Sequence, residues 1–230
     1  MAAPIRRLRH ALVRRSKIEI FLDAIALTIG GLLPIINPFS TAPLFVSLTA
    51  GFESRRRNQQ ALLGCIYAFA ILLVFLLVGS AIIGFFGISV PGMRVAGGLI
   101  ISVTGFGMLF PRPQAGSNAA QPHEAEVAFT PIAMPSLAGP GSITVVLSAA
   151  AQIRSRFPED RVLINIAVVL GLAITLAFSY LVLRAASSIV RFLGARGIDA
   201  MTRIFGFLLI CIGMQFLLTG VSDFFRIGHG

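Results

Sequence analysis

Two proline-rich stretches interrupt apolar runs of this 230-residue sequence. The first, PIINPFSTAP, occupies positions 34–43, and the second, PIAMPSLAGP, occupies positions 131–140. Both place three prolines in the pattern P-x3-P-x4-P. A proline inside a helix removes a backbone hydrogen bond and clashes with the preceding turn, at a cost of about 3 kcal/mol. Each stretch therefore predicts a break that divides an apolar helix into two half-helices.

Backbone groups freed at two such breaks could together bind a small zwitterion. The N-terminus of a half-helix offers unpaired N–H groups and about half a positive charge, which suits a carboxylate. Carbonyl oxygens freed at the end of the preceding half suit an ammonium group or a small cation. The expected substrate-binding residues lie in or beside the two stretches: Asn37, Pro38, Ser40, Thr41, Pro135, Ser136, Gly139, Gly141 and Ser142.

The residue types also predict where each half-helix begins. In the first stretch we expect one half to end at Pro34 and the next to begin near Ala42 and Pro43. Ser40 and Thr41 are then suitable N-cap residues, because their hydroxyl oxygens can accept from backbone N–H groups. The second stretch is expected to restart at the Gly-Pro pair that ends it.

Asn37 is the most polar residue in either stretch, and its counterpart in the second is Met134. Its amide can both donate and accept hydrogen bonds. It therefore either contacts the substrate or pairs with backbone groups that the break has freed. Supporting or gating roles are expected for the flanking prolines and for two arginines: Pro34, Pro43, Pro131, Pro140, Arg94 and Arg203.

Arg94 and Arg203 open a second repeated motif, RVAGGLII in the first half of the chain and RIFGFLLI in the second. Each arginine either extends toward lipid headgroups, caps freed carbonyl groups or attracts a carboxylate. Asp23 and Asp223 lie near the ends of apolar runs and are interpreted as interfacial, although either could carry a coupling proton. The coupling ion, H⁺ or Na⁺, stays open. No cofactor or metal site is expected, because the two cysteines and three histidines lack metal-ligand spacing.

The elements that carry these motifs are expected to lie in a membrane. The chain is 56% hydrophobic with a mean hydropathy of +0.89, and only 12% of its residues are charged, against roughly a quarter in soluble domains. Six apolar runs approach or exceed the roughly 20 residues needed to cross the hydrocarbon. They cover residues 20–49, 61–87, 92–110, 129–151, 162–186 and 201–225. The predicted fold class is an all-α, polytopic membrane protein with six transmembrane helices, of which the first and fourth are broken.

The order of the motifs predicts an internal duplication. Each half contains three apolar runs, an odd number, so the halves must enter the membrane from opposite sides as two inverted three-helix repeats. We divide the chain into a basic N-terminal tail (1–19), a first repeat (20–110), a connecting loop (111–128) and a second repeat (129–226), all within one membrane domain. Residues 1–16 could be an extension upstream of the native start. Glycines spaced for close helix packing are Gly97, Gly98, Gly105, Gly107, Gly206 and Gly213.

The net charge of +10 comes mainly from arginines in short loops between apolar runs. They form no continuous basic stretch, so anionic lipid headgroups are the expected partner and nucleic acid is not. The loops after the first, third and fifth runs hold seven arginines, against four in the fourth loop and C-terminal tail. The positive-inside rule then favours an N-terminus outside the cytoplasm, although the basic N-terminal tail argues for the reverse.

Four stretches resemble the MarC family of bacterial inner-membrane proteins: LLPIINPFSTAPLF, FGISVPGMRVAGGLI running on to GFGMLFP, VAFTPIAMPSLAGPGSI and RIFGFLLICIGMQF. The resemblance covers roughly residues 17–226. It implies a six-span, multi-pass protein of the bacterial inner membrane with its N-terminus outside. It also implies, from archaeal members, transport of small neutral amino acids, and a relation to exporters of the lysine-exporter type. The first break reads NPFST where the family pattern is NPIGN, which leaves the substrate open.

We therefore expect a secondary transporter of a small solute, either a small neutral amino acid such as glycine or alanine or an exported related metabolite. Such a transporter could also form a homo-oligomer. The alternative is a membrane scaffold or sensor that transports nothing. A channel is less favoured because the apolar runs are sparsely polar. An enzyme is not expected, because no Asp, Glu or His lies centrally in any run.

Overall fold

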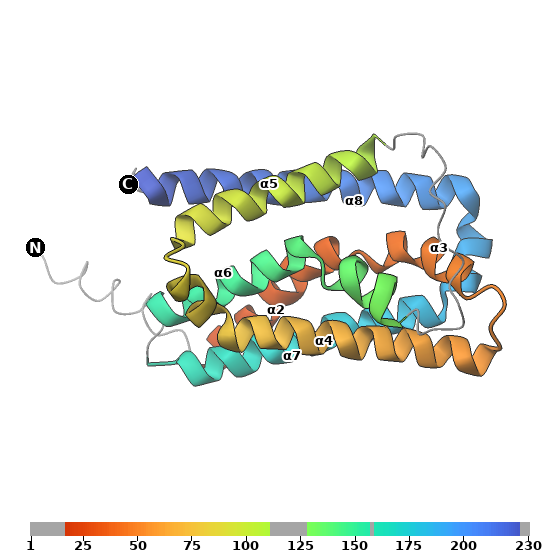
Figure 1. The fold of residues 1–230 in the computed structure, drawn as a ribbon, viewed down its shortest axis with the longest axis horizontal. Helices are drawn as coiled ribbons and strands as arrows, with labels where there is room; N and C mark the ends of the chain where they lie inside the picture. Colours follow the sequence, from red (N-terminus) through yellow and green to blue (C-terminus); the bar gives the residue numbers. More distant parts are fainter. Residues whose placement is uncertain (1–16, 111–127, 157–158, 226–230) are drawn as a thin grey trace, which may run out of the picture.

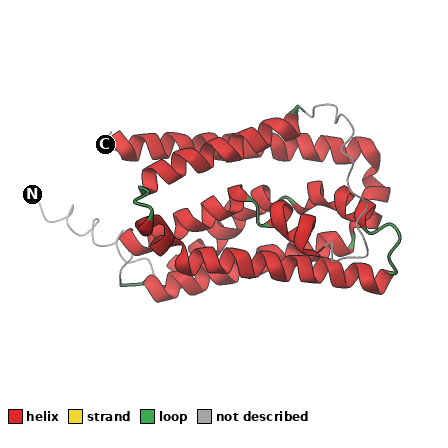
Figure 2. Ribbon diagram, viewed as in Figure 1, coloured by secondary structure: helices red, strands yellow, loops and turns green. Residues whose placement is uncertain are grey.

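The structure of the chain, a computed structural model, describes residues 17–110, 128–156 and 159–225. Within these ranges the chain is helical, with short loops and no strand (Figure 2). The all-α class predicted from composition is therefore confirmed. Residues 1–16 of the expected basic tail, residues 111–127 of the connecting loop and residues 157, 158 and 226 of the second repeat lie outside the described residues.

Most helices run roughly parallel to the long axis of the molecule and lie side by side (Figure 1). In chain order they are α2 (Lys17–Ile36), α3 (Pro38–Leu48), α4 (Ser54–Phe85), α5 (Val90–Leu109), η1 (Ala128–Leu137), α6 (Pro140–Arg156), α7 (Arg161–Arg184) and α8 (Ala186–Phe225). Figure 1 shows α5 and α8 together along one edge, α4 and α7 along the opposite edge, and α2, α3 and α6 between them. The two broken segments thus occupy the middle layer.

Five of the described helices are long and apolar enough to cross a membrane, namely α2, α4, α5, α7 and α8. The fourth expected run, 129–151, is divided between η1, of 10 residues, and α6, of 17 residues. Neither piece reaches by itself the roughly 20 residues that a crossing requires. The structure therefore supports a multi-pass membrane protein with five continuous spans.

Two expected boundaries differ in the structure. Helix α4 begins at Ser54, so most of the polar segment 51–60 is helical rather than a loop, because Arg and Gln are good helix formers. Helical structure also continues through residues 187–200, between the fifth and sixth expected apolar runs, with only a kink at Gly194, where φ is 62°. Glycine adopts this left-handed conformation without the steric penalty of a Cβ atom.

Helices α5 and α8 approach each other so closely that their backbones touch. A Cβ atom added to Gly98 would lie 2.5 Å from the carbonyl oxygen of Gly213, and one added to Gly105 would lie 2.6 Å from that of Gly206. The glycines on each helix are seven residues apart, close to two helical turns, so they form one face. The packing role predicted for these four glycines is confirmed.

The other two predicted packing glycines behave differently. Gly97 faces α6, where an added Cβ would meet the side chain of Thr144 at 1.8 Å. Gly107 faces open space, with nothing within 4 Å of an added Cβ. The packing prediction is therefore wrong for Gly107, because that residue is exposed and no neighbouring helix approaches it closely.

This difference yields a matched test of the α5–α8 contact. We expect Gly105→Ala and Gly213→Ala to lower the free energy of unfolding by about 1–3 kcal/mol, because the new methyl group would overlap backbone atoms of the partner helix. Gly107→Ala should be neutral or slightly stabilising, since alanine is the better helix former by about 1 kcal/mol. Unfolding in detergent micelles, followed by circular dichroism, measures all three. Equal stability of the three variants would contradict close packing.

Candidate functional site

The first break is a single residue. Helix α2 continues through Pro34 to Ile36, and α3 begins at Pro38. Asn37 lies between them in the left-handed conformation, with φ 40° and ψ 68°. Asparagine tolerates this conformation better than most residues, and proline suits the first position of the following helix. The expected end at Pro34 and the expected restart near residues 42 and 43 are therefore wrong.

Asn37 is also the N-cap of α3, in place of Ser40 or Thr41. Its side-chain oxygen accepts from the backbone N–H of Ser40 at 3.3 Å, and its amide nitrogen donates to the Ser40 hydroxyl at 2.9 Å. The hydroxyl of Thr41 donates in turn to the Asn37 carbonyl at 3.4 Å. Of the two roles open to Asn37, the structure thus shows the pairing of freed backbone groups.

The cap is tied to a helix from the other half of the chain. The hydroxyl oxygens of Ser40 and Thr202 in α8 are 3.3 Å apart. One residue earlier, the ring of Phe39 stacks on Phe205 of α8, with centroids 5.8 Å apart, and meets Phe178 of α7 edge-on at 6.1 Å. The start of α3 is therefore fixed against α7 and α8.

The second break is longer. Thr130 and Met134 leave the helical conformation within η1, with φ/ψ of −126°/125° and −121°/127°. Each precedes a proline, Pro131 or Pro135, and the residue before a proline is pushed toward extended geometry by its ring. Equal proline spacing therefore produces one break at a single residue and another spread over most of η1.

Helix α6 begins at Pro140, as the Gly-Pro pair predicted. The Ile143 N–H bonds to the Gly139 carbonyl at 3.0 Å, which closes the first turn. The hydroxyl of Ser142 is positioned to donate to the carbonyl of Leu137 at 3.1 Å or of Gly139 at 2.9 Å. Ser142 is almost fully buried, with 1% of its surface exposed, so it pairs a carbonyl that the break would otherwise leave bare.

The two breaks touch each other. A Cβ added to Gly141 would lie 3.1 Å from Ile35 in α2 and 3.2 Å from Ile101 in α5. Gly141 therefore allows the start of α6 to approach the end of α2 closely. The contact is apolar, while the nearby polar side chains of Asn37 and Ser142 turn to their own backbone. Ser136 is half-buried, and its side chain already has an interaction partner.

The repeated arginines are not equivalent in the structure. Arg94 is only 6% exposed and forms an ion pair with Asp223 of α8. Arg203 is exposed and pairs with Asp199 one turn earlier in the same helix, at 2.9 Å. The headgroup interpretation is therefore wrong for Arg94, because the ion pair with the end of α8 covers its guanidinium. Asp223 and Asp199, the carboxylates that pair with Arg94 and Arg203, lie outside the two breaks.

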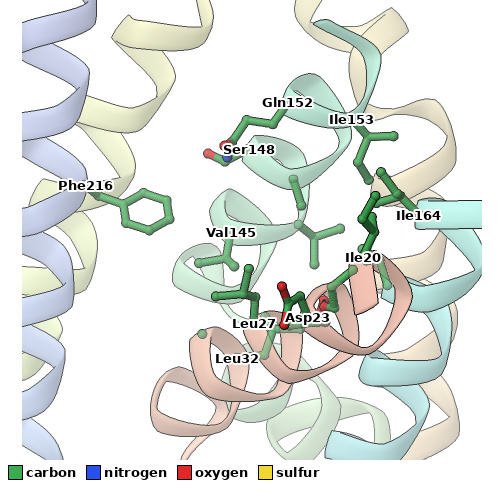
Figure 3. Close-up of a pocket in the computed structure, with 16 residues that line it drawn as sticks. Ile20, Asp23, Leu27, Leu32, Val145, Ser148, Gln152, Ile153, Ile164 and Phe216 are labelled. Carbon is green, nitrogen blue, oxygen red and sulfur yellow. The ribbon is translucent and has the colours of Figure 1, made fainter. Parts of the chain in front are cut away.

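A pocket of about 630 Å³ lies between α2, α6, α7 and Phe216 of α8 (Figure 3). One end of it reaches Gly31 and Leu32, about one and a half helical turns before Asn37. Most of the lining is apolar, and the polar exceptions are Asp23, Thr28, Ser148 and Gln152. Asp23, which was expected near the interface, is exposed and borders this pocket close to the start of α2.

Sequence reasoning did not identify Ser148 and Gln152 of α6 as site residues. Their spacing of four residues, which places both on one helix face, is a signal that could have found them. Gln60 was also missed. Its side-chain oxygen accepts from the backbone N–H of Ala128 at 3.0 Å, so α4 holds the start of η1.

The double role of Asn37 allows a specific test. Asn37→Ala should destabilise the protein by about 2 kcal/mol, because it removes the cap and places an alanine in a left-handed conformation. Asn37→Gly should cost only a few tenths to 1 kcal/mol, since glycine fits that conformation and is an acceptable N-cap. Thermal unfolding in detergent compares the two. If the alanine variant were as stable as the glycine variant, the left-handed geometry would be refuted.

Comparison with known proteins agrees with these features. The family model described as "MarC family integral membrane protein" matches residues 22–225. Inner membrane protein MarC of Salmonella typhimurium and that of Citrobacter koseri are each 40% identical over 218 residues, covering 90% of this chain and 97% of the relative. The Escherichia coli O1:K1 protein of that name is 38% identical over 217 residues, with the same coverage. No solved structure matches. The chain therefore belongs to the MarC family of integral membrane proteins and lies in the bacterial inner membrane.

Proposed function

We propose that the protein is a secondary transporter that moves a small solute across the inner membrane by alternating access. The observation that carries this proposal is the direct contact between two helix breaks, at Ile35 and Gly141, in the middle layer of the protein. Backbone irregularity at membrane depth is tolerated where it is buried in protein or lines a cavity. Transporters built from inverted repeats bind solute at discontinuous helices of this kind.

The pocket supports a conformation in which the protein is open toward one side of the membrane only. It extends from Asp23, near the start of α2, to Leu32, close to the first break. Beyond that point Ile36 and Leu137 are fully buried, at 1% and 0% exposure. We interpret the packed breaks as a closed gate and the pocket as the path that leads to it. Separation of α2 from α6 would then uncover Asn37 and Ser142 to the solute.

The size and polarity of these groups favour a small, strongly polar solute. Asn37, Thr41 and Ser142 are buried, and their hydrogen bonds go to nearby backbone or side chains. A solute such as glycine or alanine could exchange for those bonds with its carboxylate and ammonium groups. Export of a related metabolite uses the same site in the opposite direction, and the coupling ion would be H⁺ or Na⁺.

A scaffold or sensor is the second candidate, and one observation favours it. The polar side chains at both breaks pair with groups of the protein itself, so the breaks are stable without a ligand. A scaffold or sensor would need only these internal hydrogen bonds at its breaks. Flux through the protein separates the two candidates, because a scaffold passes no solute.

The transport proposal predicts saturable uptake of labelled glycine or alanine into proteoliposomes under a proton or sodium gradient. Ser142→Ala should reduce the rate about five- to tenfold, because one hydrogen bond to a buried polar group is lost. Ser47→Ala is the matched control, since this exposed hydroxyl bonds only to the Leu44 carbonyl in the same helix. Its rate should equal that of the unmodified protein. Absence of flux for either amino acid under both gradients would favour the scaffold.

The same proposal requires six crossings in two inverted repeats, with η1 and α6 together forming the fourth. In Figure 1 this segment runs beside α4 and ends near the start of α7. After replacement of Cys65 and Cys211 by alanine, single cysteines at Gly51 and Arg196 should react from the cytoplasm. Cysteines at Ile88 and Glu159 should react from outside, as the positive-inside rule suggests.

Maleimide labelling of intact cells against inverted membrane vesicles measures these positions. If the cysteine at position 159 reacted from the same side as that at position 51, η1 and α6 would form a re-entrant segment. The inverted six-span arrangement would then be wrong.

A further inference from the structure

Helix α8 is too long to lie entirely within the hydrocarbon of a membrane. Its 40 residues extend about 60 Å at about 1.5 Å per residue, against a hydrocarbon thickness of about 30 Å. Residues 195–225, which follow the kink at Gly194, extend about 46 Å by themselves and are sufficient for the crossing. Helix α7 has already crossed when it ends at Arg184. The segment between the two crossings, 186–193, therefore lies at the membrane surface.

Gly194 lets this segment depart from the direction of the helix that follows. Its φ is 62° and nothing lies within 4 Å of an added Cβ, so the turn of the backbone, and not packing, requires glycine here. Val190 packs against the core and lines a hollow with Pro43 of α3 and Met108 near the end of α5. The segment therefore lies between α3 and the end of α5, at the right-hand end of the molecule in Figure 1.

The outer face of the segment combines an aromatic ring with a cation. Phe192 is 90% exposed, more than any other large hydrophobic side chain that the structure describes, and Arg191 beside it is also exposed. On the inner face Ala186 is buried and Val190 is half-buried. Helices with one packed face and with phenylalanine and arginine available to lipid are typical of segments that lie in the headgroup layer.

The two ends of the molecule also differ in charge. Among the described residues, the end that holds this segment has seven arginines and two acids: Arg55, Arg56, Arg57, Arg184, Arg191, Arg196 and Arg203 against Glu53 and Asp199. The opposite end has five basic and five acidic residues: Lys17, Arg94, Arg154, Arg156 and Arg161 against Glu19, Asp23, Glu159, Asp160 and Asp223. Anionic phospholipid headgroups complement the first end and not the second.

We propose that residues 186–193 form a surface anchor that holds this end of the protein against anionic phospholipid. The ring of Phe192 inserts at the boundary between headgroups and acyl chains, and Arg184, Arg191 and Arg196 pair with headgroup phosphates. A guanidinium suits this role because its planar fork matches phosphate oxygens in pairs. Neither helix break takes part, so the inference does not depend on transport of a solute.

Tryptophan fluorescence tests the location of the anchor, because the chain contains no tryptophan. In proteoliposomes, Phe192→Trp is compared with Phe207→Trp, a replacement at an exposed residue near the middle of the crossing part of α8. We expect phospholipids brominated near the headgroup to quench the first variant more strongly, and those brominated near the chain end to quench the second more strongly. Equal depths would overturn the proposal, as would quenching of Phe192→Trp by aqueous iodide and by neither brominated lipid.

Thermal unfolding in lipid nanodiscs tests the choice of lipid. Replacing part of the phosphatidylcholine by phosphatidylglycerol should raise the unfolding temperature, because a lipid that binds the folded state stabilises it. The double variant Arg191→Gln/Arg196→Gln should lose about half of this gain at low salt. Its matched control at the other end, Arg154→Gln/Arg161→Gln, should keep the gain. Equal gains in the two double variants, or no gain in the unmodified protein, would overturn the proposal whatever the result of solute flux measurements.

Discussion

In the hydrocarbon of a membrane, every backbone N–H and C=O group must find a partner within the protein. This constraint explains where the two helix breaks lie and how they are built. The first is closed by Asn37, which adopts a left-handed conformation and caps the helix that follows. The second is closed by Ser142, whose hydroxyl serves a carbonyl at the end of η1. Both breaks lie in the middle layer, where α4, α7 and the α5–α8 pair cover them.

The α5–α8 layer and the middle layer differ in how they are held together. Helices α5 and α8 meet through glycines at backbone contact, and the Arg94–Asp223 ion pair joins one end of the pair. The broken helices are held by side-chain packing, as at Ile35 and Gly141, and by the aromatic contacts of Phe39. In the proposed transport cycle, the closely packed pair would act as a frame against which α2 and α6 move. The pocket reaches from the middle layer to Phe216 on that frame.

The repeated proline pattern produces unequal results in the two halves because the residues before the prolines differ. Asn37 tolerates a left-handed turn and caps the next helix in one step. Thr130 and Met134 instead adopt extended geometry, so the same proline spacing makes most of η1 irregular. Polar groups are unequally distributed as well, since the counterpart of Asn37 is the apolar Met134. A solute between the breaks would therefore meet two different surfaces.

The helical membrane class, the two breaks, the start of α6 and the glycine faces of α5 and α8 could all be predicted from the order of residue types. These follow from composition, proline spacing and helical periodicity, which act over a few residues. The packing of the helices was needed to show that Ser40 contacts Thr202, 162 residues away, and that Arg94 pairs with Asp223, 129 residues away. It also decided that Asp23 and Ser148 line one pocket. Such pairings depend on how separate helices pack. The residue types along one helix do not show which residue of another helix will lie beside them.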